Sequence, residues 1–490
     1  MAVVGYRYVR RAVLAAVVGI GGCASQDTLY QDVRQSRTDD YEQWQAARRQ
    51  ASVAEPSVSG QLALDDAVKM ALLYNKELQA VEQETAIAQG RTLEAGARAL
   101  PSVSAHGRYT QLDEAPSIGF GDQTFETAVV DNYSASLEVR QPLYEGGAIS
   151  AALRAARLNT VLSNEKIREQ VERVVFATVS AFYDALLAQR LFDVNRDAVK
   201  TAEAHLDDVN KRRKLGTASD YDMLRAEVEV SNFKAEMIRQ RNRITRAQTV
   251  LLKSMGVSQD VDKGLSLVDA LRYQAVTMTG DHAVQVALEN RPELYEAELA
   301  VRLQQEALRT AQSAYLPSIN AVVTGTEANP APHTPVDTVW GAGWTAGVSA
   351  DLPIFDLGRA GKVATEKARL RQREKQLAET RERVLMEVRQ ALLTVQDAEE
   401  FVDSQKLNLE RAAESLRLVE VGYREGLQSQ VEVTDAQTAV TQTRGFYYQA
   451  IYDHCMARLS LERAVGRLGA KGGMPVARHS GENGDKPNDQ

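Results

Sequence analysis

Apolar residues recur every seven positions in the second half of the chain. The series consists of Val388, Val395, Val402, Leu409, Leu416 and Tyr423, with Val384, Ala391 and Ala398 at intervening positions. A heptad repeat is typical of helices that pack in coiled-coil fashion. The first half carries a similar stripe of Ile167, Val171, Val175, Val179, Phe182 and Leu186. We therefore predict helices over 148–215 and 359–423, each roughly 100 Å long at about 1.5 Å per residue.

Four shorter segments also have helical spacing. They cover about 62–99 and 217–255 in the first half, and about 281–315 and 427–466 in the second. The two short segments of the first half together give about 115 Å of helix, close to the length of one long helix. Each half is therefore expected to contribute one long rod and one rod made of two shorter helices placed end to end.

Between the helical segments, the pattern changes to an alternation of apolar with polar or small residues. It is clearest in Tyr133, Ala135, Leu137 and Val139, and in Trp340, Ala342, Trp344, Ala346 and Val348. The alternation predicts strands over 102–112, 131–141, 317–326 and 339–352. Each has about ten residues, the length of a tilted transmembrane strand. We expect the tryptophan-bearing face to meet lipid and the small polar face to line a lumen; the alternative is a sheet in a soluble protein.

The four strands are expected to form two hairpins, one over 102–141 and one over 317–352. Each hairpin follows a Leu-Pro-Ser sequence, ALPSV at 99–103 and YLPSI at 315–319. Proline ends a helix and pushes the preceding residue toward extended geometry, so both sequences mark a switch from helix to strand. The hairpin tips, at 113–122 and 327–335, are rich in turn-forming residues.

Several other sequences recur in the same order. LDDAVKMALLYNKEL at 64–78 corresponds to GDHAVQVALENRPEL at 280–294, QPLYEGG at 141–147 to LPIFDLG at 352–358, and KLGTASDYDMLRAE at 214–227 to REGLQSQVEVTDAQ at 424–437. The offset is nearly constant, which indicates a duplicated unit of about 210 residues rather than an array of many short repeats. We place the two copies at 62–275 and 276–470.

The N-terminus has the features of an exported protein. Three arginines precede an apolar stretch from Ala12 to Gly22 that is too short for a permanent membrane helix, so residues 1–22 are predicted to be a signal peptide. The sequence from Ile20 to Cys23 resembles a bacterial lipobox, which implies lipidation of Cys23; the alternative is an ordinary signal peptide with an incidental cysteine. Residues 23–61 would then be a lipid-anchored segment, and the polar tail 471–490 is expected to be disordered.

Composition and charge exclude several functions. The chain has a formal charge of −8, which becomes −11 once the signal and its three arginines are removed, and it has no concentrated basic block, so nucleic-acid binding is disfavoured. The six histidines form no HExxH motif or cluster with cysteine. We expect no metal, no cofactor and no catalytic site.

Four strands cannot close a barrel in a membrane, because open sheet edges in lipid leave backbone groups without hydrogen bonds. Closure must come from several chains. Two chains would supply eight strands, whose interior side chains fill, whereas three supply twelve strands and a possible channel. Three chains would also supply twelve helical rods, which could close into a cylinder below the barrel.

With these features the chain resembles the TolC-like outer-membrane efflux proteins, including their lipoprotein members. The likeness covers about 62–470 and rests on both copies, both Leu-Pro-Ser switches, the strand exits LYEGG and IFDLG, and both glycine-centred helical turns. It implies an α+β membrane protein in which a homotrimer forms a twelve-stranded β-barrel and a long helical tunnel. It also implies an outer-membrane location extending into the periplasm, a periplasmic adaptor protein and an inner-membrane pump driven by protons or ATP.

Three functions are compatible with this reading. The first is a passive exit duct for small molecules in a tripartite efflux system. The second is the duct of a type I protein secretion system, which an inner-membrane ATPase would serve. The third is a periplasmic coiled-coil scaffold without a pore, which the strand pattern disfavours. A lipobox is frequent among family members that export small molecules, so the resemblance favours the first.

The resemblance also suggests functional residues at the two helical turns. The adaptor is expected to dock at the turns themselves, through Leu215, Gly216, Thr217, Gly422, Arg424 and Gly426. Gly216 and Gly426 are expected to end the two long helices in the left-handed conformation. A periplasmic gate is expected at Asp222, Tyr423, Gln428, Glu432 and Asp435. Asp222 and Tyr423 correspond to residues that hold the mouth shut, and Gln428 occupies a position where a basic partner can occur. Threefold symmetry would arrange Glu432 and Asp435 as acidic rings that favour cations; otherwise they are ordinary solvated helix residues.

Overall fold

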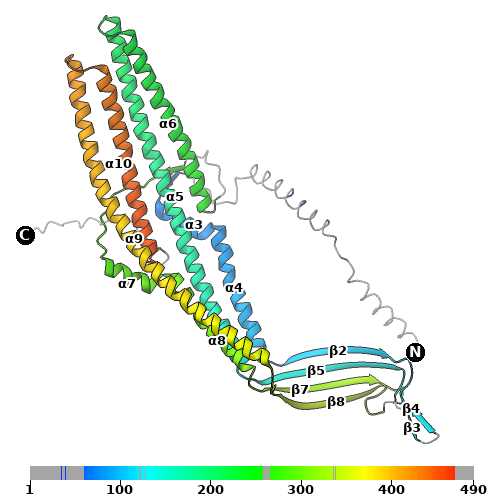
Figure 1. Cartoon of the computed structure of the whole chain (residues 1–490). Helices are drawn as coiled ribbons and strands as arrows, with labels where there is room; N and C mark the ends of the chain where they lie inside the picture. Colours follow the sequence, from blue (N-terminus) through cyan, green and yellow to red (C-terminus); the bar gives the residue numbers. More distant parts are fainter. Residues whose placement is uncertain are drawn as a thin grey trace, which may run out of the picture. The chain divides into compact units, whose positions relative to one another are not determined.

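The computed structural model divides the chain into residues 1–58 and residues 59–490. It describes residues 60–468 apart from 121–122, 127, 258–264, 335 and 337, together with Gln35 and Asp39. The predicted signal peptide, Cys23 and the C-terminal tail lie outside the described residues. The fold below is that of the second unit alone (Figure 1).

Both long helices are present as predicted. Helix α5 covers Ala148–Lys214 with 67 residues, and α9 covers Leu357–Arg424 with 68 residues. The heptad residues Val384, Val388, Val395 and Val402 are buried, whereas Leu409 and Leu416 are half-buried. The apolar stripe of α9 is therefore buried mainly along the middle of the helix. Within the described chain, no helix is both long and apolar enough to cross a membrane.

The shorter helices pair with the long ones. Helix α6 (Asp220–Ser254) packs along α5, and α10 (Gln430–Ala464) packs along α9. The segments predicted as single helices at 62–99 and 281–315 are each broken in two. The first consists of α3 (Leu64–Tyr74) and α4 (Lys76–Ala97), and the second of α7 (Gly280–Asn290) and α8 (Pro292–Ser313).

Each break has a local cause. Asn75 has extended backbone and its side chain accepts hydrogen bonds from the amides of Glu77 and Leu78, so it caps α4 while ending α3. In the second copy Pro292 is the first residue of α8, and Arg291 before it is extended.

The C-terminal end of another helix lies against each break, that of α6 in the first copy and that of α10 in the second. The side-chain amide of Asn75 donates to the Ser254 carbonyl at 2.9 Å, and Gly256 has φ +73°. A Cβ at Gly256 would lie 2.2 Å from the Tyr74 carbonyl oxygen, so only glycine allows this approach. At the second joint Arg291 donates to the Ala464 carbonyl at 3.4 Å. Helices α6 and α4, and likewise α10 and α8, therefore continue each other end to end, as predicted.

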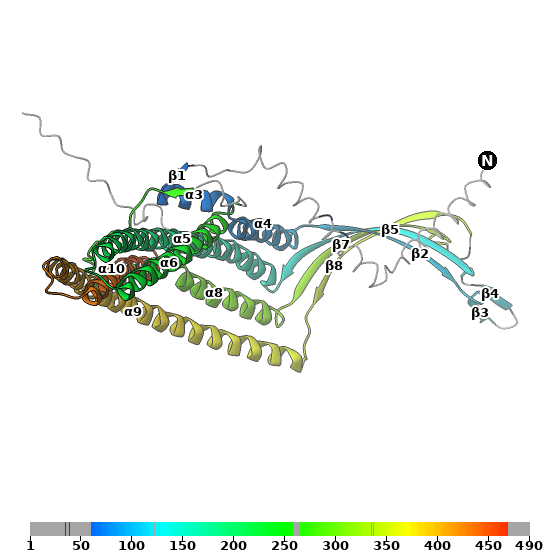
Figure 2. The same cartoon turned by 90° about the horizontal axis from the view of Figure 1, so that it is seen from above.

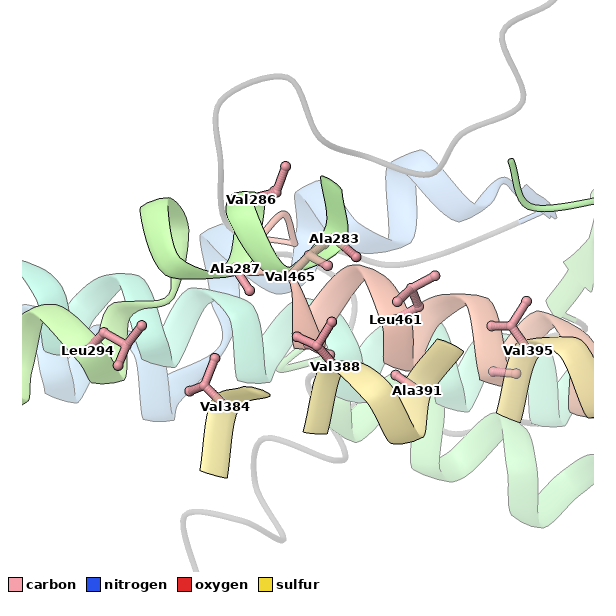
Figure 3. Packing of buried hydrophobic residues seen from close by; sticks show 12 residues of the cluster. Ala283, Val286, Ala287, Leu294, Val384, Val388, Ala391, Val395, Leu461 and Val465 are labelled. Atoms are coloured by element: carbon pink, nitrogen blue, oxygen red, sulfur yellow. The ribbon is translucent and has the colours of Figure 1, made fainter. Parts of the chain in front are cut away.

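An apolar cluster surrounds the second joint (Figure 3). Helix α7 contributes Ala283, Val286 and Ala287, and the seam of α9 and α10 contributes Val384, Val388, Ala391, Val395, Leu461 and Val465. Small and branched side chains allow the short helix α7 to lie close against the two longer ones.

The strands form one antiparallel sheet in the order β2-β5-β7-β8. They cover Ser102–Gln111, Asp131–Glu145, Ser318–Asn329 and Gly341–Asp351, so both predicted hairpins are confirmed, with β5 and β7 longer than expected. The tip predicted as turn-rich at 113–122 instead contributes to a small hairpin of β3 (Ser117–Phe120) and β4 (Gln123–Glu126). A parallel pair of β1 (Gly60–Leu62) and β6 (Leu265–Leu267) was not predicted.

The register confirms that the sheet has two different faces. Trp344 lies opposite Gly325, which lies opposite Leu137, so the tryptophan shares a face with the apolar residues of β5. Ser136 and Thr326 are paired on the other face, which is polar. Trp340 precedes β8, and its ring lies 6.4 Å from that of Tyr133.

The helices nearest the sheet follow the order of its strands, as Figures 1 and 2 show. Helix α4 packs on α5, α5 on α8, and α8 on α9. Helix α4 leads into the edge strand β2, and α9 follows the other edge strand, β8. One side of β2 and one side of β8 therefore have no neighbour within the described sheet.

Candidate functional site

The predicted site residues lie at the two turns that join α5 to α6 and α9 to α10. Gly216 and Gly426 both have φ +77°, as expected for residues that end a helix in the left-handed conformation. The Gly216 amide donates to the Arg213 carbonyl and the Thr217 amide to that of Arg212, each at 2.9 Å. These bonds satisfy the last carbonyls of α5.

Both returning helices begin with a capping box, which the sequence reading missed. Ser219 caps α6 and exchanges hydrogen bonds with Asp222, while Ser429 caps α10 and exchanges them with Glu432. A serine followed three residues later by an acid is the sequence signature of this motif, and SDYD at 219–222 and SQVE at 429–432 both match it.

The capping boxes give Asp222 and Glu432 a local structural role. The Asp222 carboxylate accepts from the Ser219 hydroxyl at 2.7 Å and from its amide at 3.0 Å, and these bonds lower the pKa of Asp222. The Glu432 carboxylate accepts from the Ser429 amide at 2.7 Å and its hydroxyl at 2.9 Å, which lowers the pKa of Glu432. Both acids are therefore held ionised at the ends of their helices.

Gln428 lies beside the second capping box. With its amide nitrogen turned toward Glu432, it donates to both carboxylate oxygens at 2.6 Å. Its side chain also covers Gly422, where a Cβ would lie 2.6 Å from the Gln428 Cγ. Gly422 therefore leaves room for the side chain that closes the turn.

Tyr423 joins the two helical hairpins. Its ring lies 4.6 Å from the guanidinium carbon of Arg212 and 5.8 Å from the ring of His205, both on α5. Burial raises the pKa of the Tyr423 hydroxyl and lowers the pKa of His205. In the described residues no hydrogen bond joins Tyr423 to Asp222, and each of these two predicted gate residues has its own contacts.

A polar seam between α6 and α10 makes the second connection. The Gln430 amide donates to the Asp222 backbone carbonyl at 2.8 Å, and Arg225 lies 3.8 Å from the Asp435 carboxylate. Deeper in the seam Glu229 is 7% exposed, and burial raises its pKa. Asp435 thus faces a basic partner, whereas Glu432 is turned back onto its own helix start.

The turn residues predicted for docking are accessible. Leu215, which precedes Gly216, and Leu427, which follows Gly426, are 79% and 80% exposed. Thr217 uses its hydroxyl to donate to the Arg212 carbonyl at 3.0 Å. Arg424 donates to the Glu420 carbonyl of its own helix at 3.3 Å. Two exposed leucines on tight turns provide an apolar contact surface.

Comparison with solved structures identifies the fold. A crystal structure of CusC superposes with a TM-score of 0.72 at 18% identity, covering 85% of this chain and 95% of that one. The open state of the MtrE outer-membrane channel of Neisseria gonorrhoeae gives a TM-score of 0.67 at 18% identity, covering 82% of this chain and 88% of that one. The fold is therefore that of the outer-membrane efflux channels.

Sequence comparison places the chain in a family. The profile of the outer membrane efflux protein family matches residues 67–257 and 283–467, one match for each copy of the duplicated unit. The toluene efflux pump outer membrane protein TtgC of Pseudomonas putida is 25% identical over 439 residues, covering 85% of this chain and 87% of TtgC. The probable outer membrane lipoprotein SilC of Salmonella typhimurium is 22% identical over 376 residues, covering 76% and 80%. The chain belongs to the outer membrane efflux protein family, which consists of channels and not enzymes.

Proposed function

We propose that this chain is one subunit of a trimeric exit duct for small molecules in a tripartite efflux system. Three copies would supply twelve strands to one barrel and twelve helical rods to one tunnel. The observation that carries the proposal is the sheet itself, which has one apolar face and, among the described strands, no partner at its two outer edges. Such a sheet is stable in a membrane only if other copies continue it.

The helical part supports a tunnel that crosses the periplasm. Helices α5 and α9 are each about 100 Å long, and the two joints make a second rod of similar length in each copy. Helix α9 needs further neighbours, because little more than one stripe of it is buried in the described part of the chain, whereas α5 is already buried on several sides around Ala185. The efflux names of the relatives, which concern toluene, cations and pyoverdine, favour small cargo over a secreted protein.

A lipid anchor at Cys23 is part of the proposal. The arginine-flanked apolar stretch and the lipobox-like sequence support it, together with the lipoprotein name of the relative SilC. Cys23→Ser removes the thiol needed for thioether formation, so fatty-acid labelling of the protein in cells should be lost. Labelling that persists in Cys23→Ser would contradict the anchor. Trimers should still insert, because the sheet buries far more apolar surface than acyl chains do.

The two turns are proposed to dock a periplasmic adaptor that connects to the inner-membrane pump. Their exposed leucines and the open space around Gly216 and Gly426 support this role. Thr217→Trp should impair export while trimers remain intact, because it adds bulk to the contact surface beside the helix end. Thr249→Trp, on an exposed face of α6 far from the turn, serves as the control. Normal export and normal crosslinking of Thr217→Trp to the adaptor would argue against docking there.

Cysteine crosslinking across the open edges tests the trimer. Ser104→Cys in β2 combined with Thr345→Cys, Gly347→Cys or Ser349→Cys in β8 should produce covalent trimers in outer membranes, because the edges of adjacent copies pair. Ser136→Cys with Thr326→Cys is the matched control, since these residues are paired within one chain and should form only an internal link. Purified trimers should also conduct ions in planar bilayers. Absence of covalent trimers in every edge combination, together with absence of conductance, would refute the proposal.

A further inference from the structure

A basic groove lies between α5 and α8, in the part of these helices that adjoins the sheet. Its volume is about 490 Å³, and its lining includes Arg154 and Arg157 of α5 and Arg302 of α8. Arg309, seven residues after Arg302, lies on the same face of α8. Because α5 starts at the sheet and α8 ends there, the two helices are antiparallel and the four arginines gather near one end of the groove.

The arginines outnumber the acid that lies among them. The Glu306 side chain is 8% exposed, and its carboxylate accepts hydrogen bonds from both Arg154 and Arg309. Arg157 and Arg302 are exposed, and neither has an ion pair or a side-chain hydrogen bond within the described residues. This end of the groove therefore carries positive charge that the described part of the chain does not neutralise.

The excess of positive charge is confined to the end next to the sheet. Farther from the sheet, Glu165 lies in line with the arginines of α5 and pairs with Arg168 at 3.1 Å. Glu298, one turn before the arginines of α8, is exposed on the same face of that helix. An anionic ligand is therefore expected to bind at the end of the groove nearest the sheet.

The depth of the arginines is that of lipid headgroups. Strand β8 has 11 residues, which at about 3.4 Å per residue and a tilt of about 45° span roughly 25 Å, the height of the apolar band of a membrane barrel. Tyr315 and Phe355 are exposed where sheet and helices meet, as in the aromatic belts of membrane proteins. Along the helices, Arg154 lies about 9 Å and Arg302 about 17 Å from this boundary. Long arginine side chains can direct their charged ends back toward the headgroups.

The groove opens on the side of the helical row that carries α7. On α5, Arg168 shares a face with Arg154, and its guanidinium donates to the carbonyl of Asn290 at the end of α7. The same guanidinium lies 5.8 Å from the ring of Tyr295, which shares a face of α8 with Arg302. A duct requires an open interior, so the side with the additional helix α7 is the outer side of the proposed trimer. Helices α5 and α8 are the inner members of the row, so contacts between copies at the sheet edges leave the groove open.

We infer that this groove binds the phosphate headgroup of an anionic phospholipid in the periplasmic leaflet of the outer membrane. The inference rests on the proposed outer-membrane duct and assigns a lipid site to its outer surface. Arg157 and Arg302 would hold the phosphate by charge-assisted hydrogen bonds, for which guanidinium groups are well suited. The acyl chains would extend from there toward the lipid-facing side of the sheet.

Lipid titration tests the site. Phosphatidylglycerol is added to purified trimers in detergent, and the bound lipid is counted by native mass spectrometry. Arg157→Gln combined with Arg302→Gln should weaken binding roughly 25-fold, because each basic residue near an anionic surface contributes about fivefold. Arg241→Gln combined with Arg246→Gln is the matched control, since both arginines are exposed on α6, which ends at the joint with α4. Equal binding by the groove variant and the control would overturn the inference.

The same titration identifies the kind of ligand. Phosphatidylcholine, which has a phosphate but no net charge, should bind the unmodified trimer more weakly than phosphatidylglycerol. Inorganic phosphate should displace the bound lipid only in large excess, because it lacks the apolar contacts of acyl chains. Displacement at equal concentration would assign the groove to small anions instead, and equal binding of the two lipids would contradict recognition by charge.

Fluorescence quenching in liposomes tests the side on which the groove opens. Ser150→Cys, on the same face of α5 as Arg154, is labelled with a fluorophore, and the lipids carry a nitroxide on an acyl chain. Phosphatidylglycerol should quench this label more than phosphatidylcholine at the same mole fraction, and the groove variant should lose the difference. Ala152→Cys is the control at nearly the same depth, because it points about 200° away around the helix and should not be quenched. Quenching of Ala152→Cys and not of Ser150→Cys would place the groove inside the duct and refute the lipid site.

The outcomes separate this inference from the proposed function. Trimers that are crosslinked through β2 and β8 and conduct ions, but bind phosphatidylglycerol equally with and without Arg157 and Arg302, would refute only the lipid site. Absence of both trimers and conductance would refute the proposed duct, and the lipid site with it.

Discussion

The joint at Gly256 can be tested by adding a single methyl group. Gly256 and Gly216 have similar backbone angles, φ +73° and +77°, so alanine pays a similar cost for the left-handed conformation at either position, roughly 1–2 kcal/mol. Their surroundings differ. A Cβ at Gly256 would lie 2.2 Å from the Tyr74 carbonyl oxygen and 2.8 Å from the Asn75 amide nitrogen, whereas nothing lies within 4 Å of a Cβ at Gly216.

Gly256→Ala should therefore destabilise the protein more than Gly216→Ala. Forcing a methyl group into a packed site typically costs a further 1–3 kcal/mol or so, which gives roughly 2–5 kcal/mol for Gly256→Ala against 1–2 kcal/mol for Gly216→Ala. The backbone must shift, because both clashing atoms belong to the main chain. The cap that Asn75 provides to α4, and its bond to Ser254, would be lost with it.

Thermal unfolding followed by circular dichroism measures the difference between the two variants. Hydrogen exchange gives a local readout, because the amides of Glu77 and Leu78 are protected by the Asn75 side chain in the intact joint. Faster exchange of these amides is expected in Gly256→Ala and not in Gly216→Ala. Equal destabilisation by the two substitutions, with unchanged exchange at the joint, would refute the end-to-end packing of α6 on α4.

Three further predictions concern the sheet, the gate and the packed helices. Trp344→Arg should reduce trimer assembly, at a cost of roughly 2–4 kcal/mol on a lipid-facing surface, while Ser349→Arg on the polar face should be tolerated; the reverse result in trimer gels would show that the faces are inverted. Glu432→Gln should lower cation selectivity in planar bilayers while keeping the capping box, since glutamine also serves there; unchanged selectivity would place this carboxylate away from the pore. Burial raises the pKa of Glu172 to about 7, above its ordinary value of 4.5, so its contribution to stability is lost as the pH rises from 4.5 through 7. Glu172→Gln should make the melting temperature less dependent on pH in this interval and raise it above pH 7; an unchanged pH profile would contradict an uncharged Glu172.

Much of the fold was predictable because the rules behind it are local. The heptad series along α9 requires a long helix, and the two Leu-Pro-Ser sequences end helices whatever surrounds them. Alternation along β5 and β8 separates an apolar face from a polar one, since successive strand residues point to opposite sides. Gly216 and Gly426 were also predictable as left-handed helix ends, because glycine adopts a positive φ at little cost wherever it stands in the chain.

The candidate site was only partly predictable. Asp222 and Glu432 lie at corresponding positions of the two copies, but the direction of their carboxylates depends on their hydrogen bonds with the capping residues Ser219 and Ser429. The placement of Tyr423 on Arg212 depends on contact between helices that lie far apart in the chain. Asp435 likewise acquires a partner, Arg225, only through the packing of α10 on α6.

Tertiary structure alone decided how these elements meet. Pairing of β5 with β7 joins the two hairpins into one sheet, and no alternation within a strand specifies a neighbour from the other copy. Asn75 breaks a helix locally, yet its bond to Ser254 requires the end of α6 to arrive there. Periodicity states which face of a helix is apolar or charged, whereas the partner of that face is selected by packing of distant segments. For this reason the sequence determined the rods, strands and turns of this protein, and the folded chain determined their order and contacts.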